Sequence, residues 1–356
     1  LMWSMGFISL VITAVVYACK YWILHGVFGQ IEADVMHHAD VYLLIVTASI
    51  PFIALYNGGA AVFRAMGNSE VSMRVSLLMN AINVSGNAIL IYGFHCGTEG
   101  VAIPTLVSRF VAAFIIIKLL LKDKWSLHLE RTFRFNPDWS MIRKILSVGI
   151  PNGLENSMFQ LGKVLVLSLV STFGTYAIAA NAVSNVITLF SILPGQAICL
   201  AVTTVIARCV GAGDYEQAKY YNKKLILLTH IGMAITIFIV FITLPFILKV
   251  YNLSEAASEA TRHIIWFHGF CAILIWAESF TLPATFRACG DAKACMIIST
   301  VSMWIFRVGA SYILGKNLGL GVFGVWVAMI IDWAFRSLLF GIRYFSGKWK
   351  KHALVS

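Results

Sequence analysis

The chain has 356 residues, of which 59% are hydrophobic and only 12% are charged, and its formal net charge is +11. A soluble globular domain carries about twice that share of charged residues, so the composition excludes the soluble classes and predicts an all-α, polytopic membrane protein. A strongly basic soluble protein would suggest a nucleic-acid partner. Here the basic residues lie in short loops beside apolar segments, where they orient membrane insertion, and we expect no nucleic-acid binding.

Apolar segments long enough to cross a bilayer recur along the whole chain. About 20 helical residues span the ~30 Å of hydrocarbon, and ten segments approach that length. We expect an N-terminal lobe over residues 1–121 with four helices, a cytoplasmic linker over 122–144, a C-terminal lobe over 145–347 with six helices, and a cytoplasmic tail over 348–356. The ten predicted spans lie near 1–24, 41–62, 73–93, 100–121, 146–171, 177–207, 225–248, 264–286, 294–315 and 321–342.

The lysines and arginines are distributed unequally between the two sides of the predicted membrane. Nineteen fall in loops on one side and four in loops on the other. Because basic loops remain in the cytoplasm, this bias predicts a protein of the inner (plasma) membrane with a cytoplasmic C-terminus. The remaining four basic residues lie inside predicted spans: Arg109, Lys163, Arg307 and Arg336.

A short motif occurs twice. The string FRAMGN over residues 63–68 recurs as FRACGD over 286–291, which is 223 positions later, and matches such as Gly86 with Gly309 continue the agreement. An internal repeat of this length is unlikely by chance, and an even number of spans between the copies gives both the same orientation. Projected back by this offset, the first copy would start roughly eighty residues before Leu1. We therefore expect a parent protein of six plus six helices in two pseudo-symmetric lobes, with its first pair absent here.

Several strings occur in a characteristic order and spacing. They are Pro151, Gly153, Leu154 and Glu155 in one helix; Gly211, Ala212, Gly213, Asp214 and Ala218 after the next; the two FRAxG copies; and Gly324-Val325-Trp326 with Asp332-Trp333-x-x-Arg336 near the end. Together they resemble the multidrug and toxic compound extrusion (MATE) family from the third parent helix onward. The resemblance implies a two-lobed antiporter that exports organic cations, drugs or other amphipathic compounds in exchange for Na⁺ or H⁺. We expect a monomer in the lipid bilayer with no cofactor beyond the coupling ion.

One position departs from that pattern. In some sodium-coupled members of the family the acid of this helix lies about a turn further from the proline, where the present chain has Phe159. The resemblance therefore transfers only approximately to Glu155.

Three acids lie inside predicted spans, and all of them are in the second half of the chain: Glu155, Glu278 and Asp332. A carboxylate near the bilayer centre costs ~2.5–3.5 kcal/mol on insertion scales, so such residues usually face a bundle interior or a wet cavity. The repeat equivalents of Glu278 and Asp332 are the uncharged Leu55 and Ser108. We predict that the three acids converge near mid-depth and bind the coupling proton or cation. Na⁺ at Glu155 and Glu278 is the only metal ion expected.

Two of these acids also have a structural interpretation. Glu155 could be a buried acid satisfied by Gln160, or by Lys163, although eight residues separate the latter from it and place it about 80° around the helix. Asp332 could pair with Arg336, which lies one turn away on the same helix, and thereby hold two helices together.

Glu278 could instead belong to a packed, hydrogen-bonded pocket with Trp276 and Ser279. Arg307 on the neighbouring helix offers Asp332 a second partner. Five residues are expected to line or support the substrate cleft: Asn156, Gln160, Lys163, Trp276 and Arg307.

Two other functions remain open. A lipid-linked sugar flippase of similar scaffold would need a cationic cleft for phosphate, which Arg109, Lys163 and Arg307 could supply. An intramembrane enzyme would need a catalytic motif, and the chain has no HExxH string, no DDxxD-like cluster and no nucleophile–base spacing. We therefore expect no enzymatic activity.

Overall fold

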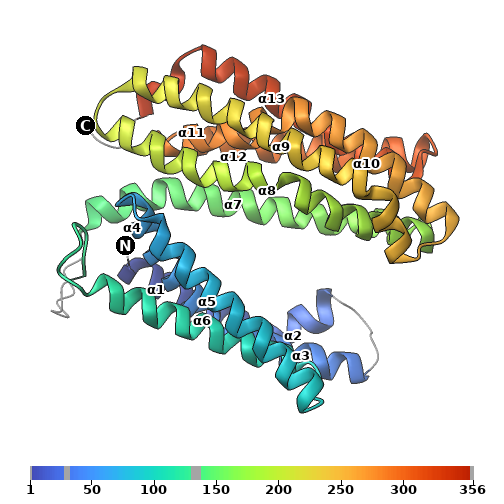
Figure 1. The fold of residues 1–356 in the computed structure, drawn as a ribbon, viewed down its shortest axis with the longest axis horizontal. Coiled ribbons are helices and arrows are strands. Elements are labelled where there is room, and N and C mark those ends of the chain that lie inside the picture. Colours follow the sequence, from blue (N-terminus) through green and yellow to red (C-terminus); the bar gives the residue numbers. More distant parts are fainter. Residues whose placement is uncertain (1, 28–32, 130–137, 353–356) are drawn as a thin grey trace. The chain divides into compact units, whose positions relative to one another are not determined.

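The computed structural model describes residues 2–27, 33–129 and 138–352. Most of these residues are helical, and within the described ranges no strand is formed. The predicted all-α membrane fold is thus confirmed. The chain divides into two compact units, Leu1–Ile142 and Arg143–Ser356 (Figure 1).

The first unit has its core between α4, α5 and α6, where the side chains of Phe63 and Ile116 are fully buried. Two of its helices continue into short π-helices, in which the backbone makes one wider turn. The elements are α1 (Met2–Ala18), α2 (Lys20–Trp22), the π-helix η1 (Ile23–Val27), α3 (Ala33–Ala48), α4 (Ile50–Ala65), α5 (Ser69–Ala88), the π-helix η2 (Ile89–Gly93) and α6 (Glu99–Leu120).

The second unit is a larger bundle in which α8 packs against both α9 and α10 (Figure 1). The closest approach is at Gly195 of α8, where an added Cβ would overlap the indole of Trp276. The elements are α7 (Trp139–Ser171), α8 (Thr175–Gly211), α9 (Tyr215–Tyr251), α10 (Glu255–Trp276), the π-helix η3 (Ala277–Thr281), α11 (Leu282–Ala288), α12 (Ala292–Ser302), the π-helices η4 (Met303–Gly309) and η5 (Tyr312–Asn317), α13 (Gly321–Phe345) and the 3₁₀ helix η6 (Lys348–His352).

Eight segments of the described chain are helical, long and apolar enough to cross a membrane. The other two predicted spans are also helical but differ in kind. The first coincides with α1, which has 17 residues, and its short continuation. The fifth lies in α7, which has 33 residues but interrupts its apolar residues with several polar ones. The eight are Asp34–Ala65, Ser69–Gly93, Glu99–Leu120, Thr175–Gly211, Tyr215–Tyr251, Glu255–Ala288, Ala292–Asn317 and Gly321–Phe345.

The two FRAxG copies form the same turn. In each copy a helix ends at the alanine and the next helix starts four residues later. Gly67 and Gly290 adopt φ angles of 82° and 85°, a left-handed conformation that favours glycine. The backbone N–H of the residue after the glycine donates to the carbonyl of Phe63 or Phe286, at 2.9 Å in both copies. This hydrogen bond defines a Schellman cap, and both phenylalanines are fully buried. The motif therefore encodes a helix end with a hydrophobic anchor.

The π-helices follow the repeat only in part. Residues 89–93 of η2 correspond to residues 312–316 of η5 at the repeat offset of 223. In contrast, the equivalents of η3 and η4 are residues 54–58 and 80–86, which lie in the regular helices α4 and α5. The wider turns of η3 and η4 are therefore additions to the second copy. Such turns are frequent at functional sites.

Candidate functional site

Glu155 pairs with an arginine from another helix. The Nη2 atom of Arg287, at the end of α11, donates to both carboxylate oxygens of Glu155, at 2.8 and 2.9 Å. The Glu155 side chain is only 12% exposed. The partners considered from the sequence, Gln160 and Lys163, were wrong, because the second FRAxG copy delivers its arginine to α7. This ion pair connects α7 to α11.

Glu278 of η3 pairs with His230 of α9. The Nε2 atom of His230 lies 3.0 Å from Oε1 of Glu278, and its Nδ1 atom lies 2.6 Å from the carbonyl oxygen of Ile273. A carbonyl only accepts hydrogen bonds, so Nδ1 carries a hydrogen. The pair then shares one further proton, which resides either on Nε2 or on the carboxyl group. The second oxygen of Glu278, Oε2, is buried, and within the described chain it has no hydrogen-bond partner. This arrangement can take up and release a proton.

Asp332 is the most buried of the three acids. Its side chain is 0% exposed and accepts a hydrogen bond from Nε of Arg336 at 3.1 Å. The hydroxyl of Ser302 donates to the same oxygen at 2.5 Å, and Arg336 donates to the carbonyl of Ser299 at 3.2 Å. The pairing with Arg336 was predicted from the sequence. The ion pair lies within α13, and its hydrogen bonds with Ser302 and Ser299 connect α13 to α12, as expected of a structural pair.

Three cations surround the ring of Phe159. The Nζ atom of Lys163 lies 4.9 Å from the ring centroid, and the guanidinium carbons of Arg307 and Arg336 lie 5.1 and 5.6 Å from it. A cation at this distance from a ring gains ~0.5–2 kcal/mol. Arg307 was also considered as a partner for Asp332, but its guanidinium donates to a methionine sulfur of α13 instead. The aromatic ring of Phe159 therefore lies among positive charges.

A cavity of about 250 Å³ lies beside these cations, between α7, α8, η4 and α13. Its lining combines two cations and two asparagine amides with apolar side chains. Trp326 donates from its indole N–H to the amide oxygen of Asn181 at 3.1 Å, which fixes that amide. The lining residues are Lys163, Val166, Leu167, Asn181, Asn185, Arg307, Val325, Trp326 and Met329.

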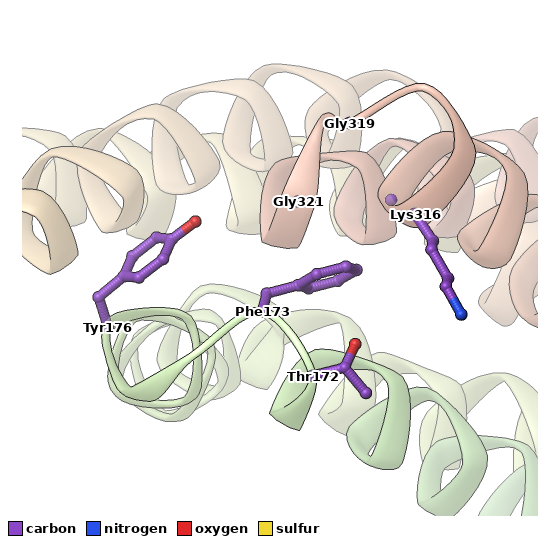
Figure 2. Close-up of a pocket in the computed structure, with 7 residues that line it drawn as sticks. Thr172, Phe173, Tyr176, Lys316, Gly319 and Gly321 are labelled. Carbon is purple, nitrogen blue, oxygen red and sulfur yellow. The ribbon is translucent and has the colours of Figure 1, made fainter.

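A second cavity, of about 380 Å³, lies elsewhere in the unit. Figure 2 shows Phe173, from the connection between α7 and α8, and Tyr176, from the first turn of α8, facing Gly319, which precedes α13, and Gly321, at the start of α13. Lys316 and Thr172 lie at its edge. None of the predicted site residues lines this cavity, so the candidate site is the smaller one.

The other predicted cleft residues lie outside the smaller cavity. Trp276 was expected in the cleft, but it is only 1% exposed, because its indole packs against Gly195 in the core. Asn156 is exposed and donates to the carbonyl of Asn152 within α7, and Gln160 is exposed on the same helix. Of the five predicted residues, two line the cavity, namely Lys163 and Arg307.

The three acids were expected to converge at one site. In the ranges that the structure describes, each acid has its own ion-pair partner from among Arg287, His230 and Arg336, and no cluster of three His, Cys, Asp or Glu residues suits a metal ion. The sequence analysis missed two of these partners. A lone histidine in an apolar span is itself a signal, which would have indicated His230. Arg287 was assigned to a loop because it follows its predicted span by one residue.

Comparison with known proteins extends this picture. The MatE family model matches residues 1–89 and 151–313. The "Probable multidrug resistance protein NorM" of Thermotoga maritima is 26% identical over 339 residues, which cover 94% of this chain and 72% of that protein. The "Uncharacterized transporter YisQ" of Bacillus subtilis is 28% identical over 352 residues, which cover 96% of this chain and 75% of that protein.

Solved structures share the fold. A crystal structure of MATE in the bent conformation matches with a TM-score of 0.86 at 19% identity, covering 98% of this chain and 78% of that one. A MOP superfamily transporter from Pyrococcus furiosus, for which reverse polarity of the binding pocket suggests a different function, matches with a TM-score of 0.87 at 20% identity, covering 97% and 78%. The family match includes Glu155, Glu278 and Arg307, whereas Asp332 lies beyond it.

Proposed function

Because this chain belongs to the MatE family and is a multi-pass membrane transporter, we propose that it exports amphipathic organic compounds, drugs among them, in exchange for a cation. Relatives named multidrug resistance proteins support the export of drugs. The excess of basic residues in alternate loops supports a place in the inner (plasma) membrane with the C-terminus in the cytoplasm. The family is one of transporters, and no enzymatic step is proposed.

The observation that carries the cation exchange is the pair of Glu278 and His230. Since Nδ1 of His230 is committed to the Ile273 carbonyl, loss of the shared proton leaves the lone pair of Nε2 facing a carboxylate oxygen at 3.0 Å. That contact is repulsive, whereas the protonated pair is held by a hydrogen bond. Protonation therefore favours the arrangement of α9 and η3 seen here, and deprotonation favours another. A coupled transporter needs this differential affinity between two states.

H⁺ at Glu278 fits the surroundings better than Na⁺ at Glu155. Both oxygens of Glu155 accept from Arg287, so Na⁺ would have to displace a guanidinium. At Glu278 one oxygen is free, but the neighbouring hydroxyl of Ser279 already donates to the carbonyl of Trp333 at 2.6 Å. Sodium prefers several oxygen ligands, as other hard cations do. Organic cations were the expected cargo, with ethidium as a suitable probe.

Export in everted vesicles tests this proposal. A proton gradient or a sodium gradient is imposed across the membrane of vesicles that contain the protein. The measurement follows the uptake of a cationic dye, ethidium, and of an anionic dye, carboxyfluorescein. We expect a proton gradient to drive uptake of at least one dye and Glu278→Gln to reduce that uptake at least tenfold. Glu259→Gln, which neutralises an exposed acid on α10, is the matched control. If neither dye is taken up, the proposed export is refuted. If Glu278→Gln keeps full activity, Glu278 has no role in coupling.

A further inference from the structure

Cations inside the second unit are usually paired with an acid. Arg287 pairs with Glu155 at 2.8 Å, Arg336 with Asp332 at 3.1 Å and Arg343 with Asp291 at 2.5 Å. A charge held away from water costs several kcal/mol unless a counter-charge compensates it, and these pairs supply that compensation.

Two cations at one cavity differ from these: Arg307, which is partly buried, and Lys163, which is exposed on α7. Within the described ranges neither has a carboxylate within 4.0 Å, and both line the same cavity of about 250 Å³. Their contacts are with neutral groups, namely the ring of Phe159 for both and the sulfur of Met329 for Arg307. Asp332, whose charge acts on Arg307, is bonded through Oδ1 to Arg336 and a serine hydroxyl, and its Oδ2 has no hydrogen-bond partner in the described chain. Lys163, Arg307 and Arg336 together with this one acid leave an excess of two positive charges around Phe159 and the cavity.

The rest of the wall specifies what the counter-charge is attached to. Asn181 and Asn185 add amide groups to the lining, with the amide oxygen of Asn181 bonded to the indole of Trp326, and Val325, Trp326 and Met329 add apolar surface. Guanidinium and amide N–H groups suit the oxygens of carboxylate and phosphate. Pockets for entire drug-sized ligands measure about 300–1,000 Å³, so this cavity is suited to the charged end of a ligand and the beginning of its apolar part.

We propose that this cavity binds the oxyanion group, carboxylate or phosphate, of an amphipathic anion, and that the cargo of the transporter therefore includes amphipathic anions. The proposal rests on the proposed export function and names a substrate class for it. Organic cations, drugs and other amphipathic compounds were the expected cargo, and the proposal adds amphipathic anions to it, because the positive charge of Lys163 and Arg307 favours an oxyanion in this cavity.

Binding to the purified protein in detergent tests the proposal directly. Fluorescence anisotropy of carboxyfluorescein and of ethidium gives the two affinities. We expect carboxyfluorescein to bind the wild type at least tenfold more tightly than ethidium. Lys163→Gln and Arg307→Gln should each weaken carboxyfluorescein binding about tenfold, whereas Lys163→Arg should retain most of it. Arg262→Gln removes the same charge from an exposed position on α10 and should change neither affinity.

Equal affinities of the wild type for the two dyes, or equal losses in Lys163→Gln and Arg262→Gln, would overturn the proposal. Size-exclusion profiles identify variants that do not fold, and Lys163→Gln alone is decisive if Arg307→Gln fails, because Lys163 is exposed. Ethidium export without carboxyfluorescein export refutes the anion proposal and leaves the export function standing.

The source of the oxyanion is distinguished by competition in nanodiscs. Displacement of carboxyfluorescein by phosphatidylglycerol, but not by phosphatidylcholine, assigns the site to an anionic lipid phosphate and supports a flippase-like cargo. If lauric acid displaces carboxyfluorescein and phosphatidylglycerol does not, the site binds a carboxylate amphiphile. If neither competitor displaces the dye and both glutamine variants still bind it, the dye does not bind at this cavity and the proposal is contradicted.

Discussion

The two copies of the internal repeat share a backbone and differ in chemistry. Both FRAxG motifs end a helix with a glycine at φ 82° or 85° and a fully buried phenylalanine. Yet the equivalents of Glu278 and Asp332 are Leu55 and Ser108, and the equivalent of Arg307 is Val84, which is 66% exposed. The turns therefore belong to the shared scaffold, whereas these three charges occur in the second copy alone.

The two copies also differ in helix type where these charges occur. Glu278 lies in η3 and Arg307 in η4, whereas the equivalent residues 55 and 84 lie in regular α-helix. A π-turn inserts one residue into the helix and so rotates the side chains that follow. In the second copy this local change aims charged side chains at His230 and at Phe159.

The largest expected effect comes from giving the second copy the first copy's residues at its buried pair. The equivalents of Asp332 and Arg336 are Ser108 and Ala112, both of them buried. Asp332→Ser alone leaves a buried guanidinium without its acid and should destabilise the protein by about 3–5 kcal/mol. The double variant Asp332→Ser, Arg336→Ala should recover much of that loss. Thermal unfolding in detergent measures both, and a double variant no more stable than the single one contradicts the interpretation.

A smaller effect is expected at the arginines of the two motifs. Arg287→Gln leaves Glu155 with a weaker donor and should cost about 1–3 kcal/mol, which is the usual penalty for a poorly satisfied buried group. Arg64→Gln, at the same position of the first copy, should change stability by less than about 0.5 kcal/mol, as do most substitutions away from such contacts. Equal losses in the two variants would show that the arginine serves the turn itself.

The smallest expected effect should be the same in both copies. Gly67→Ala and Gly290→Ala each force a Cβ into the left-handed region and should cost about 1–2 kcal/mol. The control is Gly149→Ala, at a helical glycine with nothing within 4 Å of an added Cβ, which should be neutral or slightly stabilising. Unfolding temperatures compare the three variants. If the losses of stability in Gly67→Ala and Gly290→Ala differ by more than about 1 kcal/mol, the two turns are not energetically equivalent.

The sequence predicted features that depend on neighbouring residues, but not contacts between residues far apart in the chain. Hydropathy located all ten helical regions, and the pairing of Asp332 with Arg336 was predictable because the residues are one helical turn apart. The partner of Glu155 lies 132 residues away and that of Glu278 lies 48 away. These pairings depend on which helices pack together, which a single sequence does not specify. The π-turns carry no periodic signature, so the direction of Glu278 and Arg307 could not be read from the pattern.

The contact between Trp276 and Gly195 has a mechanical consequence. Trp276 is the last residue before η3, which carries Glu278, and its indole rests on the backbone of α8 without intervening side-chain atoms. Close-packed interiors transmit displacement rather than absorb it. In the proposed mechanism, a shift of η3 on loss of the proton shared by Glu278 and His230 would therefore push α8 directly, and α8 carries Asn181 and Asn185 to the cavity of about 250 Å³. Gly195 would then connect the protonation of Glu278 to the shape of that cavity.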